Sequence, residues 1–242
     1  MTIGIITPYY KEPLKYLKKC YESVLDQKLD TKHYFIADGH SNNELDKWNI
    51  EHVILPVANS DNGNTPRGLG GELAISHGCD FIAYLDSDNW FYPNHLKSLI
   101  DLHNNTGASV CTSFRTIYDL DGNELIGAYD QDEKNLKHVD TSCYLLHRDA
   151  FSLNEIWLKM PKILSPICDR IFFAGVNRKK YKAISTGTKT VAFRSQYVSH
   201  YLQANLTPPL NAKPNVGKES YNYLSTFEGM RETVDRLGFS PI

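Results

Sequence analysis

The sequence predicts an α/β protein with a mostly parallel central sheet in its first half and a mixed second half. Short β-branched and apolar runs alternate with amphipathic helical stretches over roughly the first 100 residues, which is typical of strand–helix units with parallel strands. Asp121-Gly122 then separates two extended runs, which indicates an antiparallel hairpin. The apolar run Phe81–Leu85 ends at two carboxylates, and open α/β sheets bind ligands at this end of their strands.

Residue type and spacing define the elements of the first half. Pro8 ends the opening β-branched run, and Pro13 begins a helix with leucines on one face and lysines on the other. The expected elements are a strand at Thr2–Thr7, a helix after Pro13, strands at His33–Ala37 and Val53–Leu55, a helix from Pro66 to about His77, a strand at Phe81–Leu85 and a helix through Leu96–His103.

Three glycines stand in the first turns of the helix that begins at Pro66. Gly68, Gly70 and Gly71 each cost about 1 kcal/mol relative to alanine in a helix. Close approach by a neighbouring backbone or by a ligand would explain them. Fraying of this helix is the alternative.

The second half has shorter strands and longer loops. Ser165-Pro166 is expected to cap and begin a helix that reaches about Val176, with Asp169 in its early turns. The run Leu206–Val216 is rich in proline and asparagine and is expected as a long loop or lid. The other expected elements are strands at Ser109–Tyr118, Glu124–Tyr129, Val139–Leu146, Lys182–Ala183 and Thr190–Phe193, and a helix over Lys218–Leu237.

Composition excludes several classes of partner and location. The formal net charge is −2, whereas nucleic-acid binders carry a basic excess, so no nucleic-acid partner is expected. The five cysteines are scattered without a C-x-x-C pair, which is typical of reduced cytosolic thiols. No signal-peptide pattern or membrane-span stretch is present. We therefore expect a cytoplasmic protein, and the basic cluster 178–180 is either a solvated loop or a peripheral contact with the inner face of a membrane.

Asp86 and Asp88 are the first candidate site residues. Alternation along an extended chain sends both carboxylates to one side, with Ser87 opposite. Two oxygen donors suit a hard cation such as Mg²⁺ or Mn²⁺, whose coordination substrate phosphates would complete. Alternatively, the aspartates cap the helix that follows.

These segments together resemble the GT-A glycosyltransferases, in particular the large inverting family 2. The resemblance covers residues 2–105 well and the remainder loosely. The matching segments are Thr7-Pro8-Tyr9-Tyr10 for the opening strand, Tyr21–Gln27 for the next helix, Asp38-Gly39 for the turn that holds the nucleotide base, Pro66–Gly70 for the Ala-Arg-Asn-x-Gly segment, Asp86-Ser87-Asp88 for the metal-binding D-x-D and Cys168-Asp169 for the Glu-Asp pair.

The resemblance implies a GT-A fold with a nucleotide-sugar-binding half at 1–105 and an acceptor-binding and catalytic half at 106–242, in one continuous domain. It implies transfer of a sugar from a nucleoside-diphosphate sugar to an acceptor hydroxyl with inversion, assisted by Mn²⁺ or Mg²⁺. A ring face and a hydrogen-bond acceptor suit uracil, so a UDP-sugar is favoured, although thymine presents the same edge. The acceptor would be a carbohydrate or glycolipid, as in surface polysaccharide or lipooligosaccharide synthesis.

The resemblance also implies roles for individual residues. Asp169 would be the catalytic base, with Asp140 either a rival base or a contact of the donor sugar. Asp88 would be the main metal ligand, with Asp86 on the ribose or on the metal through water. His200 is either a third metal ligand or a structural histidine. The expected donor contacts are Thr7, Pro8, Tyr9 stacked on the base, Asp38 accepting from the base, Arg67, Asp86 and Ser87.

Four residues depart from the family pattern, and three other functions remain open. Ala37, His40 and Gly68 replace an aspartate, a serine and an asparagine, and Cys168 replaces the glutamate before the expected base. The Cys168 departure leaves open a non-catalytic nucleotide-sugar-binding module. A sugar nucleotidyltransferase is the second alternative, but it normally has a glycine-rich loop after the first strand, which this chain lacks. A phosphohydrolase is the third, and it would release inorganic phosphate, whereas a transferase releases a nucleoside diphosphate.

Overall fold

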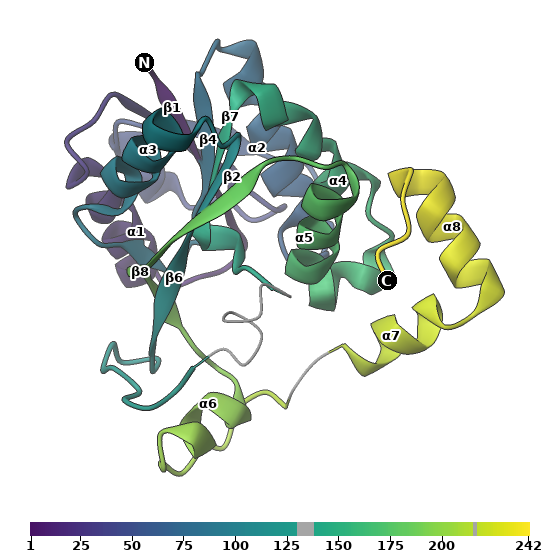
Figure 1. Cartoon of the computed structure of the whole chain (residues 1–242). Helices are drawn as coiled ribbons and strands as arrows, with labels where there is room; N and C mark the ends of the chain where they lie inside the picture. The colour runs from purple at the N-terminus through teal and green to yellow at the C-terminus, as the bar shows by residue number, and fades with distance from the viewer. Residues whose placement is uncertain (130–137, 215–216) are drawn as a thin grey trace.

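A computed structural model describes residues 1–129, 138–214 and 217–242. Eight strands form one sheet in the order β3-β2-β1-β4-β7-β6-β8-β5 (Figure 1). The strands are β1 (Ile3–Tyr9), β2 (Thr31–Ala37), β3 (Glu51–Ile54), β4 (Phe81–Tyr84), β5 (Trp90–Phe91), β6 (Val110–Tyr118), β7 (Tyr144–His147) and β8 (Ala183–Arg194). β1 runs parallel to β2 and β4, and β2 runs parallel to β3. The mostly parallel sheet expected for the first half is therefore confirmed.

Helices cover both faces of this sheet. In Figure 1, α1 and α3 lie on one side of the sheet, and α2, α4 and α5 lie on the other. The helices are α1 (Leu14–Leu25), α2 (Asn64–Ser76), α3 (His95–Thr106), α4 (Glu155–Lys159), α5 (Cys168–Arg178), α6 (Val198–Gln203), α7 (Lys218–Leu224) and α8 (Phe227–Leu237). Every residue of β1 is buried, as expected for a parallel strand covered on both faces.

The opening strand continues one residue beyond Pro8, which was expected to end it. Pro8 and Tyr9 still pair with β2. β4 pairs with β1 only as far as Ile6. At Pro8, β1 therefore has a neighbouring strand on one side only. A proline, which lacks the backbone N–H, is tolerated at such a position.

The glycines of α2 lie where neighbouring side chains come close. A Cβ at Gly71 would lie 2.1 Å from Asn154 Oδ1, and one at Gly70 would lie 2.6 Å from Ile6. A Cβ at Gly68 would lie 2.6 Å from Leu158. Close approach is thus the reason for the glycines, but side chains make it, not a backbone or a ligand.

The second half of the chain adds β7, β6 and β8 to the sheet, and these strands pair in both directions. β7 runs antiparallel to both β4 and β6, whereas β8 runs parallel to β6. Because β4 pairs with β7, both halves of the chain share one sheet. The two short strands expected at 182–193 are a single strand, β8.

The expected hairpin at Asp121-Gly122 is reduced to a turn with one bridge. Tyr118 and Glu124 form that bridge. The Asp119 carboxylate accepts from the backbone N–H groups of Asp121 and Asn123 at 2.9 and 2.8 Å. The Asp119 side chain thus closes the turn together with backbone hydrogen bonds of Asp119 to Asn123 and Gly122, and the described residues to Tyr129 form no second strand.

The C-terminal region also differs from the sequence prediction. The single helix expected over 218–237 is two helices, because Thr226 starts α8 by accepting from the backbone N–H of Gly229 at 3.0 Å. A 3-10 segment at Lys162–Ile167 precedes α5, so the α-helix begins at Cys168, not at Pro166. The expected loop is confirmed over 206–212 and 214, with a single bridge residue at Lys213, and residues 215–216 lie outside the described part.

None of the helices in the described ranges is both long and apolar enough to span a bilayer.

Candidate active site

A cavity of 650 Å³ brings together residues from both halves of the chain. Asp86 reaches it from the end of β4, Arg67 from α2, and Asp169 from the first turn of α5. Asp140 and His200 also line it. Five of the residues selected from the sequence thus meet around one space, at the carboxyl end of the parallel strands.

Arg67 and Asp86 form an ion pair on one side of this cavity. Arg67 Nη2 lies 2.7 Å from Asp86 Oδ1, and the two side chains are 3% and 29% exposed. The guanidinium also lies over the Trp157 ring, 4.8 Å from its centroid. Burial against an aromatic face and a carboxylate orients this arginine.

Asp88 does not line the cavity, unlike Asp86. Its pKa is raised to about 7, chiefly by burial and then by the nearby carboxylates of Asp86 and Glu12, and Arg194 partly offsets this. Arg194 also donates from Nε to the Asp88 carbonyl oxygen at 3.1 Å. The Asp88 carboxylate therefore lies among other negative charges outside the main cavity.

His200 lines the cavity at the start of the C-terminal region. Its Nδ1 lies 2.7 Å from the Ser195 hydroxyl, which fixes the orientation of the ring. Over the described ranges, no three side chains of His, Cys, Asp or Glu are grouped so as to hold a metal ion. The expected ligands Asp86, Asp88 and His200 are therefore not assembled around one point.

Asp140 and Arg115 form a second ion pair on the cavity wall. Arg115 Nη1 contacts Asp140 Oδ2, and Asp140 Oδ1 accepts from the backbone N–H of Ser142 at 3.0 Å. Burial raises the pKa of Asp140, and the Arg115 charge opposes that shift. The Asp140 side chain is 8% exposed, whereas that of Asp169 is 26% exposed, so Asp169 is the more accessible carboxylate.

Asp169 is bound by a histidine that the sequence interpretation did not include. His138 Nε2 is hydrogen-bonded to Asp169 Oδ2. Burial alone would raise the pKa of Asp169, but His138 and then Arg115 hold it below its ordinary value. The carboxylate is therefore ionised at neutral pH.

Arg115 and His138 lacked a clear sequence signal. Arg115 is a charged residue inside the otherwise uncharged strand β6, and a buried charge of this kind indicates a partner. His138 has no motif and lies 31 positions from its partner along the chain.

Cys168 also lines the cavity. Burial, and then the Asp169 charge, raises the pKa of its thiol to about 12. The thiol is therefore neutral and does not replace the charge of a glutamate.

The residues expected at the end of β1 mostly face inward. Thr7 is 0% exposed, and its hydroxyl lies 2.8 Å from His33 Nε2. Pro8 and Ser87 are also buried. These three side chains form the supporting wall and offer little surface to a donor.

Tyr9 is 3% exposed, so its ring has little free face for stacking. The ring contacts Phe35 and His52, and its hydroxyl lies 2.6 Å from His52 Nε2. Tyr10 is 39% exposed, and both tyrosines line a second cavity of 630 Å³ together with His40.

Asp38 is occupied by the loop that follows β3. Its Oδ1 accepts from the backbone N–H and the side-chain amide of Asn59, both at 2.8 Å, and its Oδ2 accepts from the backbone N–H of Ser60 at 3.1 Å. A carboxylate has about four acceptor positions, so one is left for a ligand. Its visible role is to hold this loop.

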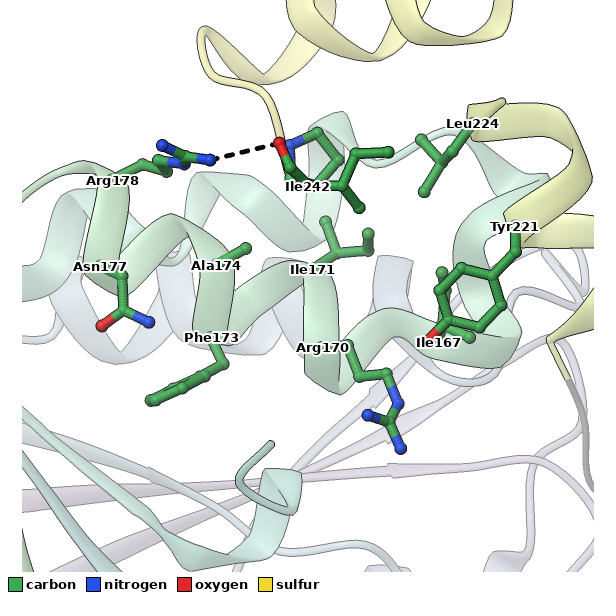
Figure 2. A pocket seen from close by; sticks show the side chains of 11 residues that line it. Ile167, Arg170, Ile171, Phe173, Ala174, Asn177, Arg178, Tyr221, Leu224 and Ile242 are labelled. Carbon is green, nitrogen blue, oxygen red and sulfur yellow. Dashed lines mark hydrogen bonds between the residues drawn. The ribbon is translucent and has the colours of Figure 1, made fainter. Parts of the chain in front are cut away.

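A further cavity of 490 Å³ adjoins the site and is of a different kind (Figure 2). It lies between α5, α7 and the C-terminal residues and shares Ile167, Arg170 and Tyr221 with the main cavity. Most of its lining is apolar, and Arg178 Nη2 donates to the Ile242 carbonyl oxygen at 3.2 Å at one end. Because it brings no catalytic side chains together, we assign the chemistry to the larger cavity.

Residues 4–152 match the sequence profile of the family described as Glycosyl transferase family 2. The match covers more than half of the chain. The chain belongs to glycosyl transferase family 2. This membership confirms the resemblance inferred from the D-x-D and its neighbouring segments. No curated protein sequence matches the chain.

The family 2 chain is similar in fold to crystal structures of TarS from S. aureus. The structure of TarS 1–349 in complex with UDP has 13% identity and a TM-score of 0.62, over 98% of this chain and 71% of that one. The structure of TarS 1–349 in complex with UDP-GlcNAc has 14% identity and a TM-score of 0.60, over 99% and 74%. A TarS structure of greater length has 13% identity and a TM-score of 0.58, over 98% and 43%. The GT-A architecture of this glycosyltransferase is therefore established.

Proposed function

We propose that the protein transfers a sugar from a UDP-sugar to an acceptor hydroxyl, with inversion at the anomeric carbon and with the assistance of Mn²⁺ or Mg²⁺. One observation carries the proposal: Asp86 and Asp169, from opposite halves of the chain, line the same cavity. Inversion requires a base on the face of the sugar opposite the leaving diphosphate. Two carboxylates that come from different halves of the chain and line one cavity support this proposal.

Asp169 is the proposed catalytic base. Its pKa lies below the ordinary value because His138 and Arg115 oppose the effect of burial, so the carboxylate is ready to accept a proton at neutral pH. Asp169 takes the proton of the acceptor hydroxyl as the new glycosidic bond forms and the bond to the diphosphate breaks. General base catalysis of this kind contributes about 10²–10⁴-fold.

Arg67, Asp86 and Tyr10 are the proposed donor contacts. The ion pair of Arg67 with Asp86 fixes both groups at the cavity wall, where Asp86 can accept from a ribose hydroxyl. Tyr10, which lines the second cavity, is the proposed stacking residue in place of Tyr9, because it is the more exposed of the two. The TarS structures bound to UDP and UDP-GlcNAc favour UDP as the nucleotide.

The carboxylates around Asp88 are suitable ligands for a divalent cation. Its carboxylate is buried beside Asp86 and Glu12, which raises its pKa to about 7, and a cation relieves such crowding. Asp88 would be the main ligand with Asp86 beside it, whereas His200 lines the main cavity, which Asp88 does not, so His200 is not part of the proposed ligand set. When bound, Mn²⁺ or Mg²⁺ offsets the negative charge that develops on the leaving diphosphate.

The proposed acceptor is a carbohydrate or glycolipid, as in the synthesis of a surface polysaccharide or lipooligosaccharide. The main cavity supports a polar acceptor, because charged side chains line it: Arg67, Asp86, Arg115, Asp140, Asp169, Arg170 and Lys213. We place this reaction in the cytoplasm, with peripheral contact at the inner face of the membrane where the acceptor is a glycolipid.

UDP release tests the proposal. We would measure it with a panel of UDP-sugars and sugar acceptors, for the wild type and for Asp169→Asn, and determine the product anomer by NMR. The expected result is turnover with inversion, and a loss of about 10²–10⁴-fold in the variant. Donor binding without turnover would favour a non-catalytic nucleotide-sugar-binding module.

A further inference from the structure

The hydrogen bond between His138 and Asp169 bears on the orientation of the proposed catalytic base. The His138 side chain is 6% exposed, whereas the Asp169 side chain is 26% exposed. The imidazole is thus largely enclosed, and the carboxylate keeps an open face. Both residues line the main cavity.

Each oxygen of the Asp169 carboxylate has one hydrogen bond. Oδ2 is bonded to His138 Nε2, and Oδ1 accepts from the backbone N–H of Arg170 at 2.7 Å. A carboxylate has about four acceptor positions, so positions remain for an acceptor hydroxyl. Two contacts on two oxygens also fix the plane of the carboxylate, which the N–H of Arg170 alone would not do.

We propose that His138 is the positioning residue of the base: it donates from Nε2 to Asp169 and holds the carboxylate toward the acceptor hydroxyl. The inference rests on the proposed transferase function. During transfer, the hydroxyl proton moves to Asp169, the hydroxyl oxygen bonds to the anomeric carbon, and the diphosphate leaves with the electrons of the broken bond. His138 keeps its proton throughout and works by orientation.

The pKa of Asp169 lies below its ordinary value, and His138 is the first of the causes that lower it. The carboxylate that His138 holds is therefore ionised. The other titratable or charged groups that interact with this pair or lie on the same cavity wall are Arg115 on β6, Asp86 after β4, Asp140 before β7, Tyr144 on β7, Cys168 and Arg170 on α5, and Tyr197 after β8.

A double-mutant cycle separates positioning from a merely structural role. We would measure kcat and KM for the wild type, His138→Ala, His138→Gln, Asp169→Asn, and His138→Ala combined with Asp169→Asn. We expect His138→Ala to lower kcat by about 10- to 100-fold, because small misplacements of a reacting group have effects of this size. His138→Gln, whose amide N–H can replace Nε2–H, should recover most of the loss. In the Asp169→Asn background, the alanine substitution should change kcat less than about 2-fold, because residues that act as a unit are not additive.

The matched control is His147→Ala. His147 also pairs with an aspartate, Asp149, at 3.1 Å, and is 21% exposed, but it does not line the cavity. This variant should keep wild-type kcat.

The outcomes distinguish this inference from the proposed function. Equal losses from His138→Ala in both backgrounds, or no recovery in His138→Gln, would overturn the positioning role while the transferase stands. If His138→Ala fails to fold, the same cycle measured with His138→Gln and Asp169→Asn decides the question. No turnover by the wild type would overturn the proposed function and the inference together.

Discussion

Arg67 and Asp86 form an ion pair across the junction of α2 and β4, with 2.7 Å between Nη2 and Oδ1. It links the arginine of the Pro66–Gly70 segment to the first aspartate of the D-x-D. The guanidinium is almost fully buried, and the carboxylate is partly open to the cavity. The pair therefore couples the stability of the fold to the shape of the site.

Removing the charge of Arg67 is expected to destabilise the protein. In Arg67→Met, Asp86 loses its partner, and breaking a buried pair costs about 3–5 kcal/mol. Because Asp86 is 29% exposed, water replaces part of the interaction, so we expect about 1–3 kcal/mol. Urea unfolding measures this free energy. A change below about 0.5 kcal/mol would contradict the structural role of the pair, and Lys97→Met, at an exposed pair, is the control.

Gly71→Ala should destabilise the packing of α2 against Asn154. The added Cβ would lie 2.1 Å from Asn154 Oδ1, and Asn154 donates from Nδ2 to the Gly68 carbonyl oxygen at 2.8 Å. Overpacking of this kind costs about 1–3 kcal/mol. Thermal unfolding should show a lower midpoint, whereas Leu69→Ala, at a 36% exposed position of the same helix, should change it little. An unchanged Gly71→Ala midpoint would show that the contact can relax.

Asp88→Asn should stabilise the metal-free protein at alkaline pH. The folded pKa of Asp88 is raised from 3.8 to about 7, so its contribution to stability is fully present below pH 3.8 and is lost as the pH rises through 7. With EDTA, we expect the variant to exceed the wild type by about 1–3 kcal/mol at pH 8 and by less at pH 5. Unfolding at both pH values measures the difference. An equal effect at pH 5 and pH 8 would contradict the raised pKa.

Divalent metal should make the wild type more stable than Asp88→Asn. If Asp88 helps to hold Mn²⁺, the ion should raise the unfolding midpoint of the wild type by mass action and should raise that of Asp88→Asn much less. Differential scanning fluorimetry with Mn²⁺, Mg²⁺ and EDTA measures both. The same shift in wild type and variant would place the ion elsewhere.

Much of the fold follows from local sequence, and much of the site does not. The runs at Phe81–Leu85 and His33–Ala37 predict strands because β-branched and apolar residues suit a buried parallel sheet. The insertion of β7 between β4 and β6 depends on pairing between distant segments, which local pattern does not encode. The break at Thr226 came from one capping hydroxyl.

Local sequence likewise predicted some residues of the candidate site and missed others. Arg67, Asp86 and Asp169 were selected from the sequence, and all three line the cavity. Thr7 and Tyr9 lie in the expected segment, but their side chains are buried, because the direction of a side chain at a strand end depends on its tertiary neighbours. His138 reaches Asp169 only through the fold.

Nucleotide binding tests the proposed nucleotide-sugar site most directly. Unfolding midpoints would be measured with UDP, GDP, dTDP and CMP, each with and without Mn²⁺, for the wild type and for Asp86→Asn. We predict that UDP with Mn²⁺ raises the wild-type midpoint, that UDP alone raises it less, and that Asp86→Asn loses most of the shift. If no nucleotide shifts the wild-type midpoint, that result contradicts a nucleotide-sugar site in the main cavity.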